Sequence, residues 1–245
     1  MPTYLFYPLC QILTILIVVY IVYFLTTTYR DVLIAYRVSE TRIKNILLYF
    51  VTGILFWLSI LSWVAYYGFF EDFDFLPPKI LVSFIPPIFL ITYLVFSKHF
   101  WKMLKVIPPT KLVRVQVFRI PMEIMLWLGF CGGFVPFQMT FIGFNYDIIV
   151  GITAMIATSV FFKRKIQRLP IIIWNVFGIL LLGTIVFIAA VSTPSPIRLF
   201  TNEPANTFLA QVPFIWVTGL IVPFALGMHL FSLRQMIGMR VKRKK

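Results

Sequence analysis

The chain has 245 residues, of which 60% are hydrophobic and 12% are charged, against about 25% charged residues in an average soluble domain. Apolar runs long enough to cross a bilayer recur along it, and no polar stretch is long enough to form a soluble domain. The formal net charge of +14 does not indicate nucleic-acid binding, because the Lys and Arg residues sit in short clusters between apolar runs. We therefore predict an all-α integral membrane protein in which residues 1–245 form a single domain in the lipid bilayer.

Seven apolar stretches, taken in chain order, have roughly the 17 to 25 residues that a helix needs to cross a bilayer core of about 30 Å. Lipid offers no hydrogen-bond partners to backbone amides, so each spanning segment is expected to be a helix. The predicted spans are about 4–28, 45–69, 79–97, 112–134, 147–163, 169–192 and 209–233.

Basic residues concentrate in alternate connections between these spans, in groups at 30–44, 98–114, 163–168 and 234–245. The other connections collect most of the acidic residues. The excess of Lys and Arg on cytoplasmic loops predicts an N-terminus outside the cell and a C-terminus in the cytoplasm. The basic tail at 240–245 either only fixes this topology or also touches anionic lipid head groups.

Prolines interrupt three of the predicted spans away from their ends. They are Pro86 and Pro87 in the third span, Pro121 in the fourth, and Pro213 and Pro223 in the seventh. Each removes a backbone hydrogen bond and frees a carbonyl that neighbouring groups must satisfy inside a bilayer. Kinked helices of this kind suggest a bundle with internal room.

Four polar side chains fall within the predicted spans at comparable depth. With a rise of about 1.5 Å per residue from the cytoplasmic side, Arg119 lies about 6 Å deep and Glu123 about 12 Å. Asn175 and His229 each lie about 7 Å deep on the sixth and seventh spans. If their helix faces converge, these four residues form a polar pocket in the cytoplasmic half of the bundle.

Arg119 and Glu123 are four residues apart, which places them on one helix face within pairing distance. Mutual neutralisation is expected, since an unpaired charge at the bilayer centre costs about 2.5–3.5 kcal/mol. As a functional pair, they would carry a proton or hold a polar ligand group. Alternatively, the helix begins at Pro121, with Glu123 in its first turn and Arg119 reaching toward head groups.

The connection between the fourth and fifth spans carries Asn145 and Asp147. Asn145 is a candidate N-cap, with Asp147 in the first turn of the following helix. The functional alternative joins these two residues to Glu203 and Asn206 in a polar mouth on the outer face.

Cofactor and catalytic signals are sparse. His99 and His229 are expected at similar depth and could supply the axial ligands of a haem, which is a minor alternative. His229 and Ser232 are close enough for a nucleophile and its base, but neither a GxSxG nor an HExxH motif accompanies them. The cysteines have no metal-binding spacing. No cofactor or metal is therefore predicted, and no catalytic residue is assigned.

Several runs resemble a group of uncharacterised bacterial multi-spanning membrane proteins, for which no activity is known. The runs are VQVFRIPMEIMLW, QMTFIGFNYD, FTNEPANTF and PFIWVTGLIVPFALGMHLFSL, within about 112–236. The resemblance implies a location in the bacterial inner membrane. It also selects Arg119 with Glu123, Asn145 with Asp147, and His229 as the positions to test first. Rhodopsins are excluded, since residues 209–233 contain no lysine for a retinal Schiff base.

Three functions remain open. The first is binding or transport of a small or lipid-like solute through the polar pocket. The second is a structural or accessory role in a membrane complex or homo-oligomer, which the 27 Phe residues would suit by lateral packing. The third is a membrane enzyme or haem redox protein.

Overall fold

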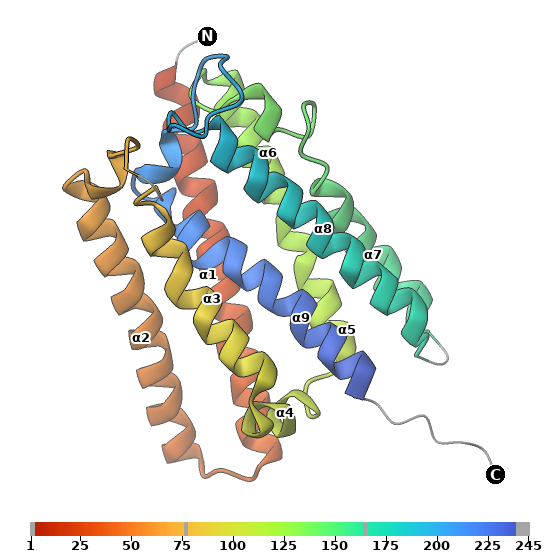
Figure 1. The fold of residues 1–245 in the computed structure, drawn as a ribbon. Coiled ribbons are helices and arrows are strands. Elements are labelled where there is room, and N and C mark those ends of the chain that lie inside the picture. Colours follow the sequence, from red (N-terminus) through yellow and green to blue (C-terminus); the bar gives the residue numbers. More distant parts are fainter. Residues whose placement is uncertain (1–2, 76–77, 164–165, 239–245) are drawn as a thin grey trace.

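The computed structural model describes residues 3–75, 78–163 and 166–238, and every regular element in these ranges is helical. The long helices pack along a common direction, and the beginning of α1 and the end of α9 lie at opposite ends of the bundle (Figure 1). The all-α prediction is confirmed. The predicted lipid contact of the tail at 240–245 lies outside the described residues.

Each predicted span contains one or more helical segments. The long elements are α1 (Thr3–Ala35), α2 (Glu40–Tyr66), α3 (Leu81–Phe96), α6 (Arg119–Cys131), α7 (Ile148–Phe161), α8 (Arg168–Ser192) and α9 (Val222–Gly238). The short ones are η1 (Phe69–Glu71), α4 (Lys98–Leu104), α5 (Pro109–Arg114), η2 (Val115–Phe118), η3 (Phe137–Met139), η4 (Phe208–Ala210) and the π-helical turn η5 (Val217–Ile221).

Four helical segments of the described residues are long and apolar enough to cross a membrane, or five if α3 and α4 count as one span. The four are α1, α2, α8 and the continuous η5–α9 segment, whereas α3 and α4 meet at an 80° bend. The prediction of seven such helices is therefore wrong. α7 has 14 residues, a length of about 20 Å that is short of a core of about 30 Å, whereas α6 continues α5 and η2 without a break.

The segment between α6 and α7 folds back along α6. An added Cβ at Gly132 would lie 2.8 Å from Cβ of Phe6, so α6 ends beside the beginning of α1. From there, residues of this return segment contact residues of α6 in reverse order along the chain. The successive contacts are Phe137 with Phe130, Phe141 with Trp127, Asn145 with Glu123, and Asp147 with Arg119.

Because of this return, α7 begins level with Arg119, about 18 Å along the axis from the Cys131 end of α6. Sequence reading had placed the beginning of this helix on the outer face, because the apolar run resembles a full span. Irregular backbone at membrane depth is tolerated only where the protein itself satisfies its polar groups. The return segment therefore needs buried polar partners.

α9 is the central helix of the bundle, packed against α3, α5 and α8 (Figure 1). In the most apolar part of the continuous η5–α9 segment 61% of the residues are buried, against 11% for α2 at the periphery. The exposed side chains of α2 include Leu48, Phe56 and Trp63. Apolar surface of this extent suits contact with lipid rather than water.

The π-helical turn η5 precedes α9 where Pro223 interrupts the backbone hydrogen bonds. Pro223 has no N–H to donate to the carbonyl of Gly219, and the indole N–H of Trp57 on α2 donates to that carbonyl at 3.0 Å. The proline-freed carbonyl is thus satisfied by a neighbouring helix, as a bilayer requires.

We predict that Gly143→Ala destabilises the return segment, since an added Cβ would lie 2.3 Å from the carbonyl oxygen of Phe137. Overpacking of this kind costs about 1–3 kcal/mol, and should lower the thermal unfolding midpoint of the purified protein in detergent. Gly53→Ala is the matched control, because nothing lies within 4 Å of an added Cβ there. Equal midpoints for the two variants would contradict the described path of the segment.

Candidate functional site

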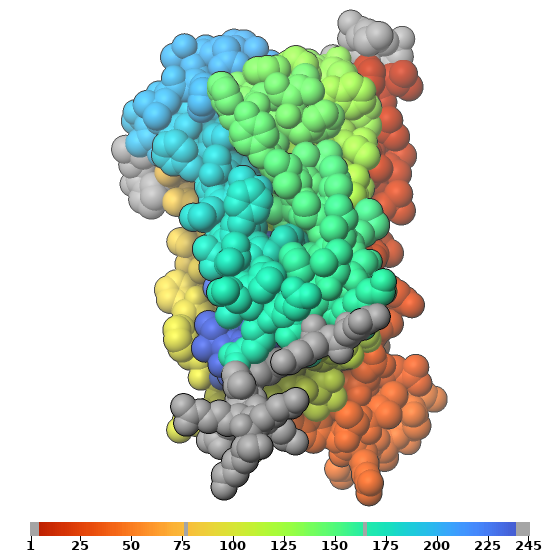
Figure 2. All heavy atoms as spheres, turned by 90° about the vertical axis from the view of Figure 1, so that its right-hand side faces the viewer, coloured from red at the N-terminus to blue at the C-terminus, as the bar shows by residue number. Residues whose placement is uncertain are grey.

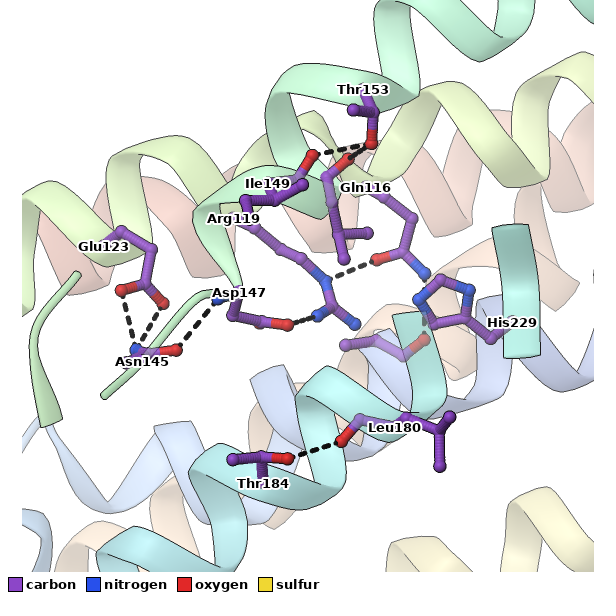
Figure 3. A network of polar contacts seen from close by, with 12 residues as sticks. Gln116, Arg119, Glu123, Asn145, Asp147, Ile149, Thr153, Leu180, Thr184 and His229 are labelled. Carbon is purple, nitrogen blue, oxygen red and sulfur yellow. Dashed lines mark hydrogen bonds and ion pairs between the residues drawn. The ribbon is translucent and has the colours of Figure 1, made fainter. Parts of the chain in front are cut away.

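Three charged side chains are buried among the described residues, and they lie together. Arg119 and Glu123 come from α6, and Asp147 comes from the residue directly before α7. Their exposed fractions are 1%, 2% and 5%. Figure 3 shows them in one row with Gln116 and Asn145. The cluster sits where the return segment meets α6.

Arg119 is the hub of this cluster. Its Nη1 forms an ion pair with Asp147, and its Nε donates to Oε1 of Gln116 at 3.1 Å. Gln116 in turn donates through Nε2 to the carbonyl of Ala225 on α9 at 3.0 Å. Nη2 of Arg119 has no hydrogen-bond partner among the described residues. One guanidinium thus connects α6, the beginning of α7 and the central helix.

Glu123 is bound by Asn145 rather than by Arg119. Nδ2 of Asn145 donates to the two carboxylate oxygens of Glu123 at 2.8 and 2.7 Å, and to the carbonyl of Met139 at 3.0 Å. The predicted ion pair between Arg119 and Glu123 is therefore replaced by the pair of Arg119 with Asp147. Sequence spacing favoured the neighbour on the same helix, whereas the return segment brings in a second carboxylate.

The beginning of α7 differs from the prediction in a related way. The N-cap residue is Asp147, whose side chain forms no capping hydrogen bond, and its carboxylate pairs with Arg119 instead. Asn145 stands two residues earlier, where its Oδ1 accepts the backbone N–H of Asp147 at 3.1 Å. This is the local turn that asparagine side chains favour.

The other two residues of the predicted pocket form a second group. Nδ1 of His229 and Oδ1 of Asn175 are 3.0 Å apart, and Asn175 donates to Oγ of Ser232 at 3.0 Å. An added Cβ at Gly178 would lie 2.6 Å from Nε2 of His229, so the imidazole lies tightly between α8 and α9. Figure 3 places His229 beside Gln116 and Arg119.

The four predicted pocket residues therefore lie on three neighbouring helices. Their hydrogen bonds place Arg119 and Glu123 in one group and Asn175 and His229 in another. His99, the other histidine considered for a haem, is exposed on α4, whereas His229 is fully buried on α9. The two imidazoles therefore lie in different environments.

The four residues predicted to form an outer mouth do not gather in one open site, although Asp147 and Asn206 both line one internal cavity. Asn145 and Asp147 are buried against α6, as described above. Asn206 is buried beside the end of α8, where its Nδ2 donates to the carbonyl of Ala189 at 2.9 Å. Glu203 is exposed and pairs with Arg198 at 3.0 Å, and this hydrogen bond lowers the pKa of its carboxyl. The prediction of one open mouth is not supported by this arrangement.

Sequence reasoning missed a third polar group near Asn206. Nε2 of Gln138 on η3 donates to Oγ of Ser192 at 2.8 Å, and Nδ2 of Asn202 donates to Oε1 of Gln138 at 2.9 Å. These contacts hold the beginning of the return segment against the end of α8. The only signal in the sequence was a glutamine within an apolar run.

A cavity of about 150 Å³ lies between α3, α6, α8 and η5–α9. Its wall on α8 follows one helix face from Leu182 to Thr193, a length of about 16 Å. The wall is mainly apolar and includes the charged cluster on one side. Its other polar members are Thr193, Asn206 and Thr218. In Figure 2, α7 and α8 cover the neighbouring face of the bundle, and the segment after α8 lies at the end where α1 begins.

No protein-family model, curated protein or solved structure matches this chain. Within the described ranges, no group of three or more His, Cys, Asp and Glu residues is placed to hold a metal ion. The functional argument therefore rests on the cavity and the polar cluster in its wall.

We predict that Asp147→Asn destabilises the protein by about 3–5 kcal/mol, because it removes the carboxylate that pairs directly with the buried Arg119 guanidinium, while Glu123 stays bound to Asn145. Chemical unfolding of the purified variant in detergent measures the loss. Adding Arg119→Gln to Asp147→Asn should recover part of it, since the unpaired charge is then removed.

The control for this prediction is Asp31→Asn, which breaks the exposed pair of Asp31 with Lys111 at 2.5 Å. Exposed pairs contribute at most about 1 kcal/mol. A loss for Asp147→Asn no larger than for Asp31→Asn would show that the buried ion pair is not formed.

Proposed function

We propose that this chain is a bacterial inner-membrane protein that binds, and by extension transports, a small lipid-like solute in the cavity between α3, α6, α8 and η5–α9. The observation that carries the proposal is the combination of an elongated apolar wall with a buried charged cluster at one side of it. Binding sites for small molecules are mainly apolar cavities with a few placed polar groups.

The size of the cavity supports a small solute or one segment of a chain. A cavity of about 150 Å³ in an apolar core accommodates a benzene-sized molecule. The lining residues of α8 recur on one face, so the available space is long rather than round. A short alkyl chain suits this shape.

The irregular helix beside the cavity also favours a binding role. Val217, Thr218 and Ile221 of the π-helical turn line the cavity. Such turns are rare in helices and occur frequently at functional sites. The neighbouring hydroxyls of Thr218 and Ser83 are 2.6 Å apart, which links η5 to α3.

Membrane location and orientation are part of the same proposal. The apolar helices are compatible with a membrane protein, and the resemblance to bacterial multi-spanning proteins favours the inner membrane. The basic connections favour a cytoplasmic C-terminus.

A cysteine introduced at Arg37 should then react with an impermeant thiol reagent only after the cells are opened.

We predict that Val186→Phe, which places a larger side chain in the cavity wall, removes a solute that co-purifies with the wild-type protein. Mass spectrometry of extracts from the purified protein measures the solute. Val176→Phe is the matched control on the same helix, since Val176 is exposed and does not line the cavity. A wild-type protein that carries no solute, or equal loss from both variants, would contradict the proposal.

A further inference from the structure

We infer that the solute is an amphipathic amine, whose positively charged head lies at the cluster of Arg119, Glu123 and Asp147 and whose alkyl chain fills the apolar part of the cavity. This inference rests on the proposed function and specifies its ligand class.

The charged side chains in the wall are one guanidinium and two carboxylates. With both carboxylates ionised, the cluster has one more negative charge than positive charges, that is, one excess negative charge. In the described part of the chain, no buried Lys or second buried Arg accompanies Arg119. His229 is hydrogen-bonded to Asn175 and packs against Trp174, with ring centroids 5.3 Å apart. In that ionisation state one added cation would balance the cluster, and a buried charge without a partner is unfavourable.

The neutral polar groups of the wall present mainly acceptors. Oδ1 of Asn206 is buried and accepts no hydrogen bond from any described residue. Thr193 donates its hydroxyl hydrogen to the carbonyl of Ala189 at 2.9 Å and already accepts from Nδ2 of Asn206 at 3.3 Å, which leaves only one further acceptor position on its oxygen. An ammonium group has up to three donors and no acceptor. A donor-rich solute matches these groups, independently of the charge count.

An anionic solute fits this wall poorly. Two of the three nitrogens of the Arg119 guanidinium are already bound to Asp147 and Gln116. A carboxylate at the remaining Nη2 would lie near Asp147 and Glu123, which carry the same charge. Nη2 instead suits an uncharged oxygen, such as a hydroxyl group close to the amine.

The test compares three probes of equal chain length, hexylamine, hexanol and hexanoate, by calorimetric titration of the full chain in nanodiscs of zwitterionic lipid. Titration of empty nanodiscs gives the background from partition into lipid. We expect hexylamine to bind at least tenfold more tightly than hexanol, and hexanoate to bind most weakly. Hexanol or hexanoate binding as tightly as hexylamine would overturn the amine assignment.

Variants locate the preference within the cavity. Glu123→Gln should reduce hexylamine binding to the level of hexanol, whereas the exposed Asp31→Asn should change the binding of neither probe. Asn206→Leu removes the unpartnered acceptor without altering the charged cluster, and should weaken hexylamine more than hexanol. It therefore serves as a second test if Glu123→Gln does not fold. An unchanged preference for hexylamine in Asn206→Leu and in folded Glu123→Gln would refute the assignment.

The outcomes that contradict a solute site in the cavity differ from those that contradict only the amine assignment. If none of the three probes binds above the background of empty nanodiscs, and Val186→Phe behaves as the wild type, the cavity is not a binding site and both proposals fall. If hexanol and hexanoate bind and are lost in Val186→Phe, the cavity binds solute and only the amine assignment is wrong.

Discussion

The buried ion pair between Arg119 and Asp147 is the interaction on which this architecture depends. It holds the beginning of α7 against the middle of the bundle, and it brings 16 residues of irregular chain, from 132 to 147, back along α6. Neither charge could remain there alone, because breaking a buried pair leaves an uncompensated charge at a cost of about 3–5 kcal/mol. The pair and the return segment therefore require each other.

The other buried polar side chains of the cluster form hydrogen bonds that add to this ion pair. Asn145 connects Glu123 to the carbonyl of Met139, so it satisfies both a carboxylate and the backbone of the return segment. Gln116 accepts a hydrogen bond from Arg119 and donates one to the carbonyl of Ala225 on the central helix. These bonds explain how irregular backbone is accommodated inside an apolar bundle. They also place charged groups in the wall of a cavity that is otherwise apolar.

The cavity arises where regular helix packing is interrupted. η5 widens the helical turn before α9, and its residues line the cavity. Trp57 satisfies the carbonyl of Gly219 from outside, so the interruption leaves no unsatisfied backbone group at that carbonyl. The return segment brings polar groups to the wall of the cavity and η5 interrupts the regular helix beside them, which is the physical basis of the proposed solute site.

The sequence by itself determined the helical class, the apolar surface and the approximate position of the long helices. These features follow from composition and run length, because lipid requires helices wherever the chain is continuously apolar. It also identified Arg119, Glu123, Asn145 and Asp147 as unusual. Only the tertiary structure decided that Asp147 pairs with Arg119 and that α7 begins inside the bundle. An apolar run has the same composition whether it forms a full span or a short helix with a return segment, and partners 28 residues apart are chosen by packing.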